Sequence, residues 1–175
     1  KKSLDSKRKN KIFQPVKSMV ERHVETFKNL GFDIDLTQPN FPEKVKPSEE
    51  VFKVCGEKGN TNWIGIAPFA QYESKVYPLD LTQEVIHKLA ENNSNKIFLF
   101  GGGKKETEQL HALSANVDNV IVVAGKLKLQ QELQLISNLD VMLSMDSGNS
   151  HIAAMLGVKV VTLWGATHPY AGFKI

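Results

Sequence analysis

From residue 62 onward, the sequence alternates short apolar runs with segments of helical periodicity, and this alternation constrains the fold more than any other feature. The apolar runs predict strands at residues 63–67, 97–100, 120–123, 141–143 and 158–163. The segments between them predict helices at residues 81–90 (with Asp80 as N-cap), 106–115, 129–139 and 150–156. Continuous apolar strands that alternate with helices are typical of a parallel sheet covered on both faces. We therefore expect an α/β fold of Rossmann type, with its ligand beyond the carboxyl ends of the strands.

The composition is that of an ordinary globular protein and excludes several other classes. The 175 residues are 41% hydrophobic and 23% charged, which is not typical of disordered or fibrous chains. Cys55 is the only cysteine, so an intramolecular disulfide or a Cys-rich zinc site is impossible, and a reducing cytoplasm is the expected location. No apolar run approaches the roughly 18 to 20 residues that a membrane-spanning helix needs.

The first 61 residues differ from the rest, and we expect residues 1–61 to be a basic arm, a helix and an extended connector before a domain at residues 62–175. Residues 1–17 contain seven Lys or Arg and one Asp, whereas the remaining chain carries a net charge of −3. A solvated linker is favoured for this arm over a nucleic-acid or lipid contact, because it has one Arg and one aromatic residue. Apolar spacing predicts a helix at residues 17–30 with Gly31 after its end, and three prolines in residues 33–47 indicate the connector. The sequence starts without Met, and we expect it to be part of a longer protein.

Four polar junctions follow the predicted strands, at residues 68–78, 101–106, 124–129 and 144–151. In the last of them, a strand leads into Asp146-Ser147-Gly148 and then into a helix. Gly148 allows close approach of a ligand to the backbone, and free N–H groups at a helix N-terminus favour an anion such as a phosphate. The carboxylate of Asp146 accepts hydrogen bonds from hydroxyl groups, which a sugar supplies. A plain helix cap is the alternative interpretation of these three residues.

The motifs at these junctions resemble those of glycosyltransferase family 9, the ADP-heptose:lipopolysaccharide heptosyltransferases and their relatives. The last junction matches the family's D-[ST]-G-x-x-H-x-A-A segment, and G-x-T-x-P follows the last strand at Gly165, Thr167 and Pro169. Upstream, the residues that match further family motifs are Pro68-Phe69-Ala70 with Ser74-Lys75-Val76-Tyr77-Pro78, Gly101-Gly102 with Glu106, and Ala124-Gly125-Lys126 with Leu129. The departures are Phe69 for Gly, Tyr77 for Trp, and Asn149 for a commoner Pro or Leu.

The resemblance implies one half of a GT-B glycosyltransferase, the half that binds the nucleotide sugar. It implies an inverting, metal-independent transfer of a sugar from an ADP-heptose-like donor to a glycolipid or glycan acceptor, as in lipopolysaccharide biosynthesis. The catalytic base is expected in the absent N-terminal half, so the chain alone is expected to be inactive. The implied location is the cytoplasm, at the inner face of the cytoplasmic membrane and in peripheral contact with it. A non-catalytic nucleotide-binding protein and a GT-B-like sugar-nucleotide epimerase remain as alternatives.

The same resemblance suggests roles for single residues, each with a structural alternative. Lys75 offsets negative charge on the leaving diphosphate, or is a solvated lysine. Glu106 binds ribose hydroxyls, or places favourable charge in the first turn of a helix. Leu127 lies against adenine or packs in the core, and His151 bonds to phosphate or holds the loop. The expected donor-binding set is Ser74, Lys75, Glu106, Leu127, Asp146, Ser147, Gly148 and His151.

Other nucleotide and catalytic motifs are missing from the sequence. Residues 101–105 lack the spacing and final Ser or Thr of a P-loop, and no GxGxxG or GxSxG segment is present. The five histidines show no HExxH or paired ligand spacing. Asp33-Ile34-Asp35 imitates the DxD of metal-dependent glycosyltransferases, but it follows a predicted helix end rather than a strand. No metal, cofactor or nucleic acid is therefore expected.

Overall fold

The computed structural model describes residues 14–173, so most of the basic arm at residues 1–17 lies outside the described residues. Contacts divide the chain into two units. Residues Phe41–Gly165 form one unit, which we call the sheet unit, and the chain before and after them forms the other. This division falls about twenty residues before the boundary expected from the sequence at residue 62.

The sheet unit contains five parallel strands in the order β3-β2-β1-β4-β5. In chain order, the strands are β1 (Asn62–Ala67), β2 (Asn95–Leu99), β3 (Val120–Val122), β4 (Val141–Met145) and β5 (Lys159–Leu163). The strand order reverses between β1 and β4, because β2 and β3 lie on one side of β1 while β4 and β5 lie on the other. The predicted Rossmann-like parallel sheet is thus confirmed, and its switch point lies between β1 and β4.

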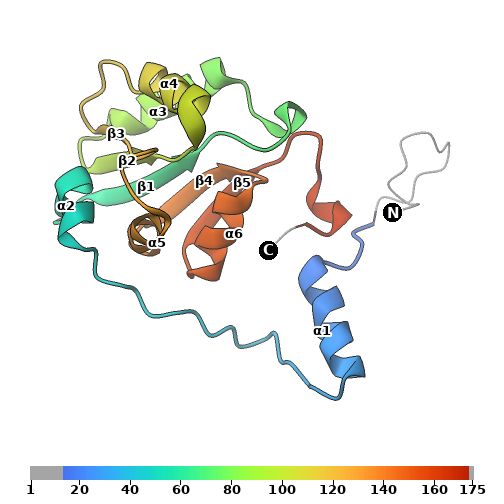
Figure 1. Ribbon diagram of the computed structural model, residues 1–175. Coiled ribbons are helices and arrows are strands. Elements are labelled where there is room, and N and C mark those ends of the chain that lie inside the picture. The colour runs from blue at the N-terminus through green and yellow to red at the C-terminus, as the bar shows by residue number, and fades with distance from the viewer. Residues whose placement is uncertain (1–13, 174–175) are drawn as a thin grey trace. The chain divides into compact units, whose positions relative to one another are not determined.

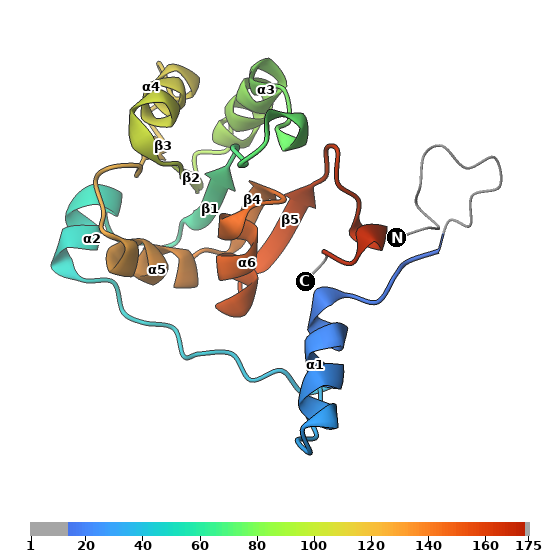
Figure 2. The same cartoon turned by 45° about the vertical axis from the view of Figure 1, so that its right-hand side comes forward.

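Helices cover both faces of this sheet (Figures 1 and 2). One face is covered by α3 (Leu79–Ala90) and α4 (Gly103–Leu113). The other is covered by α2 (Glu49–Cys55), α5 (Leu129–Ser137) and α6 (Gly148–Met155). Each face has its own cluster of buried apolar side chains. Burial on both faces is the reason that the strands are continuously apolar rather than alternating.

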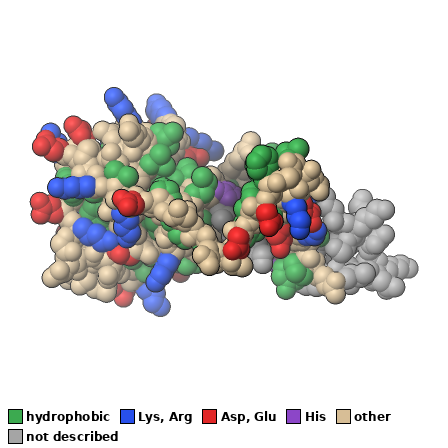
Figure 3. Space-filling view, turned by 90° about the horizontal axis from the view of Figure 1, so that it is seen from below, with side chains coloured by type: hydrophobic (Ala, Val, Ile, Leu, Met, Phe, Trp, Pro, Cys, Tyr) green, Lys and Arg blue, Asp and Glu red, His purple; other side chains and the backbone are tan. Residues whose placement is uncertain are grey.

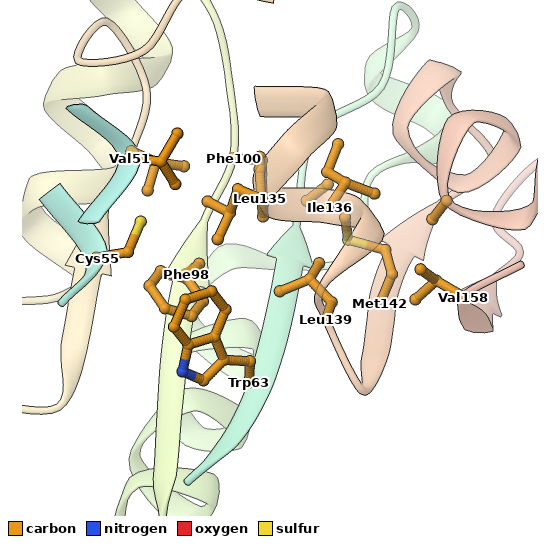
Figure 4. Packing of buried hydrophobic residues seen from close by; sticks show 13 residues of the cluster. Val51, Cys55, Trp63, Phe98, Phe100, Leu135, Ile136, Leu139, Met142 and Val158 are labelled. Atoms are coloured by element: carbon orange, nitrogen blue, oxygen red, sulfur yellow. The ribbon is translucent and has the colours of Figure 1, made fainter. Parts of the chain in front are cut away.

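The core beneath α2, α5 and α6 is centred on two aromatic side chains (Figure 4). Trp63 of β1 and Phe98 of β2 are fully buried and pack edge to face, with ring centroids 5.0 Å apart. Helix α2 contributes Val51 and Cys55 to this cluster, and burial raises the pKa of the Cys55 thiol to about 11. Helix α2 was not predicted from the sequence, because seven residues after a proline-rich segment are too few to establish a helical period.

Helix α3 begins differently from the prediction. Asp80 was expected as its N-cap, but the helix begins at Leu79 with Pro78 as N-cap, and Asp80 lies in the first turn. A carboxylate in the first turn still interacts favourably with the helix dipole. The prediction that Asp80 lies at the start of the helix is thus confirmed, but its assignment as N-cap was wrong.

The second unit contains the predicted amphipathic helix, α1 (Met19–Asn29). Ser18 and Glu21 form a reciprocal capping box at its start, and Gly31 follows its end with a φ of 90°, as expected. Two backbone hydrogen bonds, Val16 N to Tyr170 O and Met19 N to Gly172 O, link the start of α1 and the residues before it to the C-terminal segment. Residues distant in sequence therefore meet within this unit.

One half-exposed carboxylate links the starts of two neighbouring strands. Asp140, directly before β4, accepts hydrogen bonds from Lys58 Nζ at 2.9 Å and from the backbone N–H of Trp63 at 2.7 Å. Partial burial by itself raises the pKa of Asp140, but these two hydrogen bonds outweigh it and hold the pKa below its ordinary value of 3.8. The start of β1 is thus linked to the start of β4 by an ionised carboxylate.

Replacement of Asp140 by Asn is expected to lower the free energy of unfolding at pH 7 by about 1 kcal/mol, after allowance for solvent screening of a half-exposed carboxylate. A carboxyl group with a lowered folded-state pKa stabilises above its unfolded pKa and loses that contribution as the pH falls through the folded value. The difference between variant and wild type should therefore shrink below pH 4 in urea denaturation. Asp118→Asn, at an exposed position, is the matched control, and an equal loss in both variants would contradict this account.

Candidate functional site

The carboxyl ends of three neighbouring strands meet at one edge of the sheet unit. Pairing places Ala67 of β1 opposite Ser144 of β4, and Ser144 opposite Thr162 of β5. The segments that follow these strands therefore lie next to one another beyond the sheet (Figure 2). This is the switch-point edge at which open α/β sheets bind their ligands.

An ion pair joins two of these segments. Lys75 ends the 3-10 turn Glu73–Lys75 after β1, and its Nζ lies 2.7 Å from Oδ2 of Asp146, the first residue after β4. The Asp146 side chain is 7% exposed and that of Lys75 is 22% exposed, so the pair is largely shielded from water. Two residues separated by 71 positions, both predicted to bind the donor, are thus brought together.

Helix α6 begins directly beside this pair. Ser147 is its N-cap and Gly148 its first residue, and the Ser147 hydroxyl lies 3.1 Å from that of Ser144 rather than capping the backbone. The N–H groups of the first turn of α6 are therefore not capped by Ser147 and suit an anion. His151 Nε2 lies 3.9 Å from Oδ1 of Asp146, so the predicted histidine also belongs to this cluster.

Glu106 lies at the same edge, in the first turn of α4. Its Oε2 accepts a hydrogen bond of 2.7 Å from the backbone N–H of Gly102. Together with Ser147, Glu106 lines an open hollow, whose other side chains include Phe69, Phe100 and Asn149. The carboxylate thus bonds to the glycine segment and lines the hollow, and its role toward a ligand remains a prediction.

Two predicted residues occupy less informative positions. Leu127 is partly buried and packs against the core cluster of Trp63, in agreement with the packing alternative. Ser74 is exposed in the turn that carries Lys75. Their assignment to the donor site remains a prediction.

Two residues of this edge had no assigned role in the sequence analysis. Phe69 lines the hollow, although it was noted only as a departure from the family motif. Gly165, after β5, lies against the backbone of Ser74 and Lys75. The motif match at Gly165 marked the position, but sequence contains no signal for which backbone it touches.

The DxD-like segment has a structural explanation. Asp35 Oδ1 accepts hydrogen bonds from both the backbone N–H and the hydroxyl of Thr37, which lower the pKa of Asp35. This is an Asx turn, a common way for Asp to close a bend. Within residues 14–173, no three side chains of His, Cys, Asp or Glu gather as a metal-binding group.

Charge is distributed without a large patch of one sign on the face shown in Figure 3, where acidic and basic side chains are interspersed over the sheet unit. Among residues 14–173, none of the helices is both long enough and apolar enough to cross a bilayer.

Comparisons with known proteins agree with the fold and with the predicted family. The model of glycosyltransferase family 9 (heptosyltransferase) matches residues 2–171, and the chain belongs to this family. It is 32% identical over 105 residues to the lipopolysaccharide core heptosyltransferase OpsX of Haemophilus influenzae, covering 59% of this chain and 30% of that protein. It is 30% identical over 149 residues to lipopolysaccharide heptosyltransferase 1 of Campylobacter coli, covering 82% of this chain and 42% of that protein.

A solved structure shows the same fold. The Escherichia coli heptosyltransferase WaaC with ADP superposes with a TM-score of 0.70 at 24% identity, covering 95% of this chain and 50% of that one. The chain thus spans about half the length of WaaC, and less than half of each of the two relatives above. The match is consistent with one domain of a GT-B enzyme.

Replacement of Gly148 by Ala is expected to leave the melting temperature almost unchanged but to weaken ADP binding. A Cβ atom at this position meets no atom within 4 Å, and its φ lies outside the left-handed region, so the fold does not require glycine. The added methyl group would instead occupy space that a phosphate needs to reach the first turn of α6. Calorimetric titration together with a thermal melt checks this; a variant that binds ADP like the wild type would show that phosphate does not approach Gly148.

Proposed function

We propose that this chain binds the nucleotide-sugar donor of an inverting, metal-independent glycosyltransferase of heptosyltransferase type, as the donor half of a GT-B enzyme. The observation that carries the proposal is the shielded Lys75–Asp146 pair beside the first turn of α6, at the switch point of the sheet. The ADP bound by WaaC and the lipopolysaccharide core activity in the name of OpsX support an ADP-heptose-like donor.

In this proposal, each part of the donor meets a matching group. The diphosphate lies on the N–H groups of Ser147 and Gly148 and against the ammonium of Lys75. Sugar hydroxyls donate to Asp146, and ribose hydroxyls donate to Glu106. Further contacts are assigned to Ser74 and His151 at the diphosphate and to Leu127 at the base.

The reaction follows from this arrangement. An acceptor hydroxyl oxygen forms a bond to the anomeric carbon of the sugar while the bond from that carbon to the phosphate oxygen breaks, which inverts the configuration. The nucleoside diphosphate leaves with the electron pair, and Lys75 stabilises the charge that develops on it. The proton of the acceptor passes to a base supplied by the other half of the enzyme.

The proposed acceptor is a lipopolysaccharide core or another glycan of the cell envelope. The proposed site of action is the inner face of the cytoplasmic membrane, where a soluble donor and a lipid-linked acceptor meet. Both assignments rest on the relatives, two of which are lipopolysaccharide heptosyltransferases.

Titration calorimetry with ADP, UDP and GDP in the presence of EDTA tests the donor-binding part. We expect saturable, weak binding that is strongest for ADP, because a half-site lacks the second wall that excludes water. No heat with any of the three would contradict donor binding. The isolated chain should not transfer sugar from ADP-heptose, and turnover by it would contradict the assignment of the base to the other half.

A further inference from the structure

The segment that leaves β5 touches the turn at Glu73–Lys75 more closely than any side chain would allow. A Cβ atom on Gly165 would lie 2.6 Å from the carbonyl oxygen of Ser74 and 2.9 Å from Cα of Lys75. Both atoms belong to the backbone, so no side-chain rotation would relieve the overlap. The φ of Gly165 lies outside the left-handed region, and glycine is therefore required here by close approach rather than by backbone conformation.

The register of the sheet explains why the contact falls on this turn. Met145 pairs with Leu163, so the residues that follow β4 and β5 continue side by side beyond the sheet. Asp146 is the first residue after β4, and Gly165 is the second after β5. Two contacts thus hold the turn: the Lys75 ammonium forms an ion pair with Asp146, and the backbone of Ser74 and Lys75 packs against Gly165.

Within residues 14–173, few other contacts fix the position of this turn. It contains no buried residue, and its hydrogen bonds from Lys75 N to Tyr72 O and from Val76 N to Glu73 O are internal. Directly after the turn, the backbone N–H of Tyr77 donates to Sδ of Met145, the last residue of β4, at 3.0 Å. Displacement of the turn at Gly165 would therefore be passed directly to the Lys75 side chain.

We infer that Gly165 is a positioning residue for Lys75. Because glycine has no Cβ atom, the turn can lie close enough to the segment after β5 for the Lys75 ammonium to contact both Asp146 and the diphosphate. The first part of this inference concerns the ion pair alone, and the second rests on the proposed function. Gly165 has no side chain that could contact the donor, and we infer that its effect on binding passes through the turn. This predicts a selective loss of affinity for the diphosphate.

Gly165→Ala tests the ion-pair part without any ligand. We expect the Lys75 amine to react at least threefold faster with an amine-acetylating reagent than in the wild type, because its shielded pairing with Asp146 is loosened. Peptide mass spectrometry measures this rate. Gly65→Ala is the matched control: its Cβ would crowd the side chains of Leu139 and Met142 in the core, which lowers stability without touching the turn. An unchanged rate in folded Gly165→Ala, or an equal increase in Gly65→Ala, would overturn the inference.

ADP and adenosine titrations test the second part. Partial misplacement of one charge-assisted contact should weaken ADP binding about three- to tenfold and leave adenosine binding unchanged. In a Lys75→Ala background, Gly165→Ala should have no further effect on ADP affinity. A further loss in that background would overturn the route through Lys75. Absence of ADP binding in the wild type, combined with the faster acetylation, would remove the proposed function and leave the positioning role standing.

A measurement on the wild type covers the case in which Gly165→Ala does not fold. The amide of Lys75 closes the 3-10 turn Glu73–Lys75 and the amide of Thr61 closes the turn at residues 58–61, with N–O distances of 2.9 and 3.0 Å, and both residues are half-buried. Because Gly165 lies against the Lys75 turn, whereas the Thr61 turn precedes β1 at the other end of the strand, the Lys75 amide should exchange with deuterium at least tenfold more slowly than the Thr61 amide. Equal exchange would overturn the inference.

Discussion

Replacement of Lys75 by Ala is expected to lower the affinity for ADP about ten- to a hundredfold while leaving the affinity for adenosine within about twofold. A hydrogen bond to a charged group contributes roughly 1.5 to 3 kcal/mol, which corresponds to that range. The ammonium is largely shielded and already held 2.7 Å from Asp146, so little of its interaction with a diphosphate is lost to solvent or to ordering of the side chain. Adenosine has no phosphate, so its affinity should not depend on Lys75.

Lys104→Ala is the matched control for this experiment. Lys104 lies at the start of α4, at the same edge of the sheet, but its side chain is 91% exposed. An exposed charge is screened by solvent, so its removal should change ADP affinity less than threefold. Equal losses of ADP affinity in both variants would show that phosphate is attracted by the overall positive charge of this edge rather than by a contact with Lys75. Equal loss of ADP and adenosine in Lys75→Ala would place Lys75 away from the diphosphate.

Replacement of Asp146 by Asn is expected to give the opposite pattern of selectivity. The amide keeps the shape of the side chain, and its oxygen can still accept a hydrogen bond from Lys75 and hold the ammonium in place, so ADP affinity should stay within about threefold. The amide weakens the acceptance of sugar hydroxyls, so the preference for ADP-heptose over ADP should be lost. The variant should also unfold more easily by about 1 to 3 kcal/mol, because Lys75 loses its shielded counter-ion. Titration with both ligands and a urea denaturation curve measure the two effects.

The exposed Asp118→Asn variant controls for the loss of one negative charge. If Asp146 serves only to hold Lys75, its Asn variant should weaken ADP and ADP-heptose equally. Unchanged sugar preference in Asp146→Asn would therefore remove the residue from the donor site, whatever its effect on stability.

The sheet was predictable because its strands are buried on both faces. Residues such as Ile64, Phe98 and Met142 form apolar runs that only a covered parallel strand requires, and the helices between them supply the cover. Strand order was not predictable from these runs, since pairing between β1 and β4 depends on contacts across almost eighty residues. Helix α2 was missed because its two core side chains, Val51 and Cys55, are too few to establish a period.

The site was predictable in its residue types but not in its geometry. Polar residues after strands had to meet at one sheet edge, which placed Lys75 and Asp146 together in principle. Their pairing at 2.7 Å and the burial of Asp146 depend on the path of the turn after β1, which the sequence does not specify. The role of Gly165 was hidden for the same reason, because a glycine required by close approach is recognised only when the other backbone is known.

The most direct measurement of the central claim is a map of backbone amide shifts in a nitrogen-15 spectrum of the chain titrated with ADP. The account predicts that saturable shifts concentrate at residues 68–78, 101–106 and 144–151, with the N–H of Gly148 among the largest, and that Lys75→Ala reduces them. Shifts gathered instead at the open hollow beside His87 and Asn116, far from this edge along α3 and α4, would contradict it. So would a spectrum that ADP leaves unchanged.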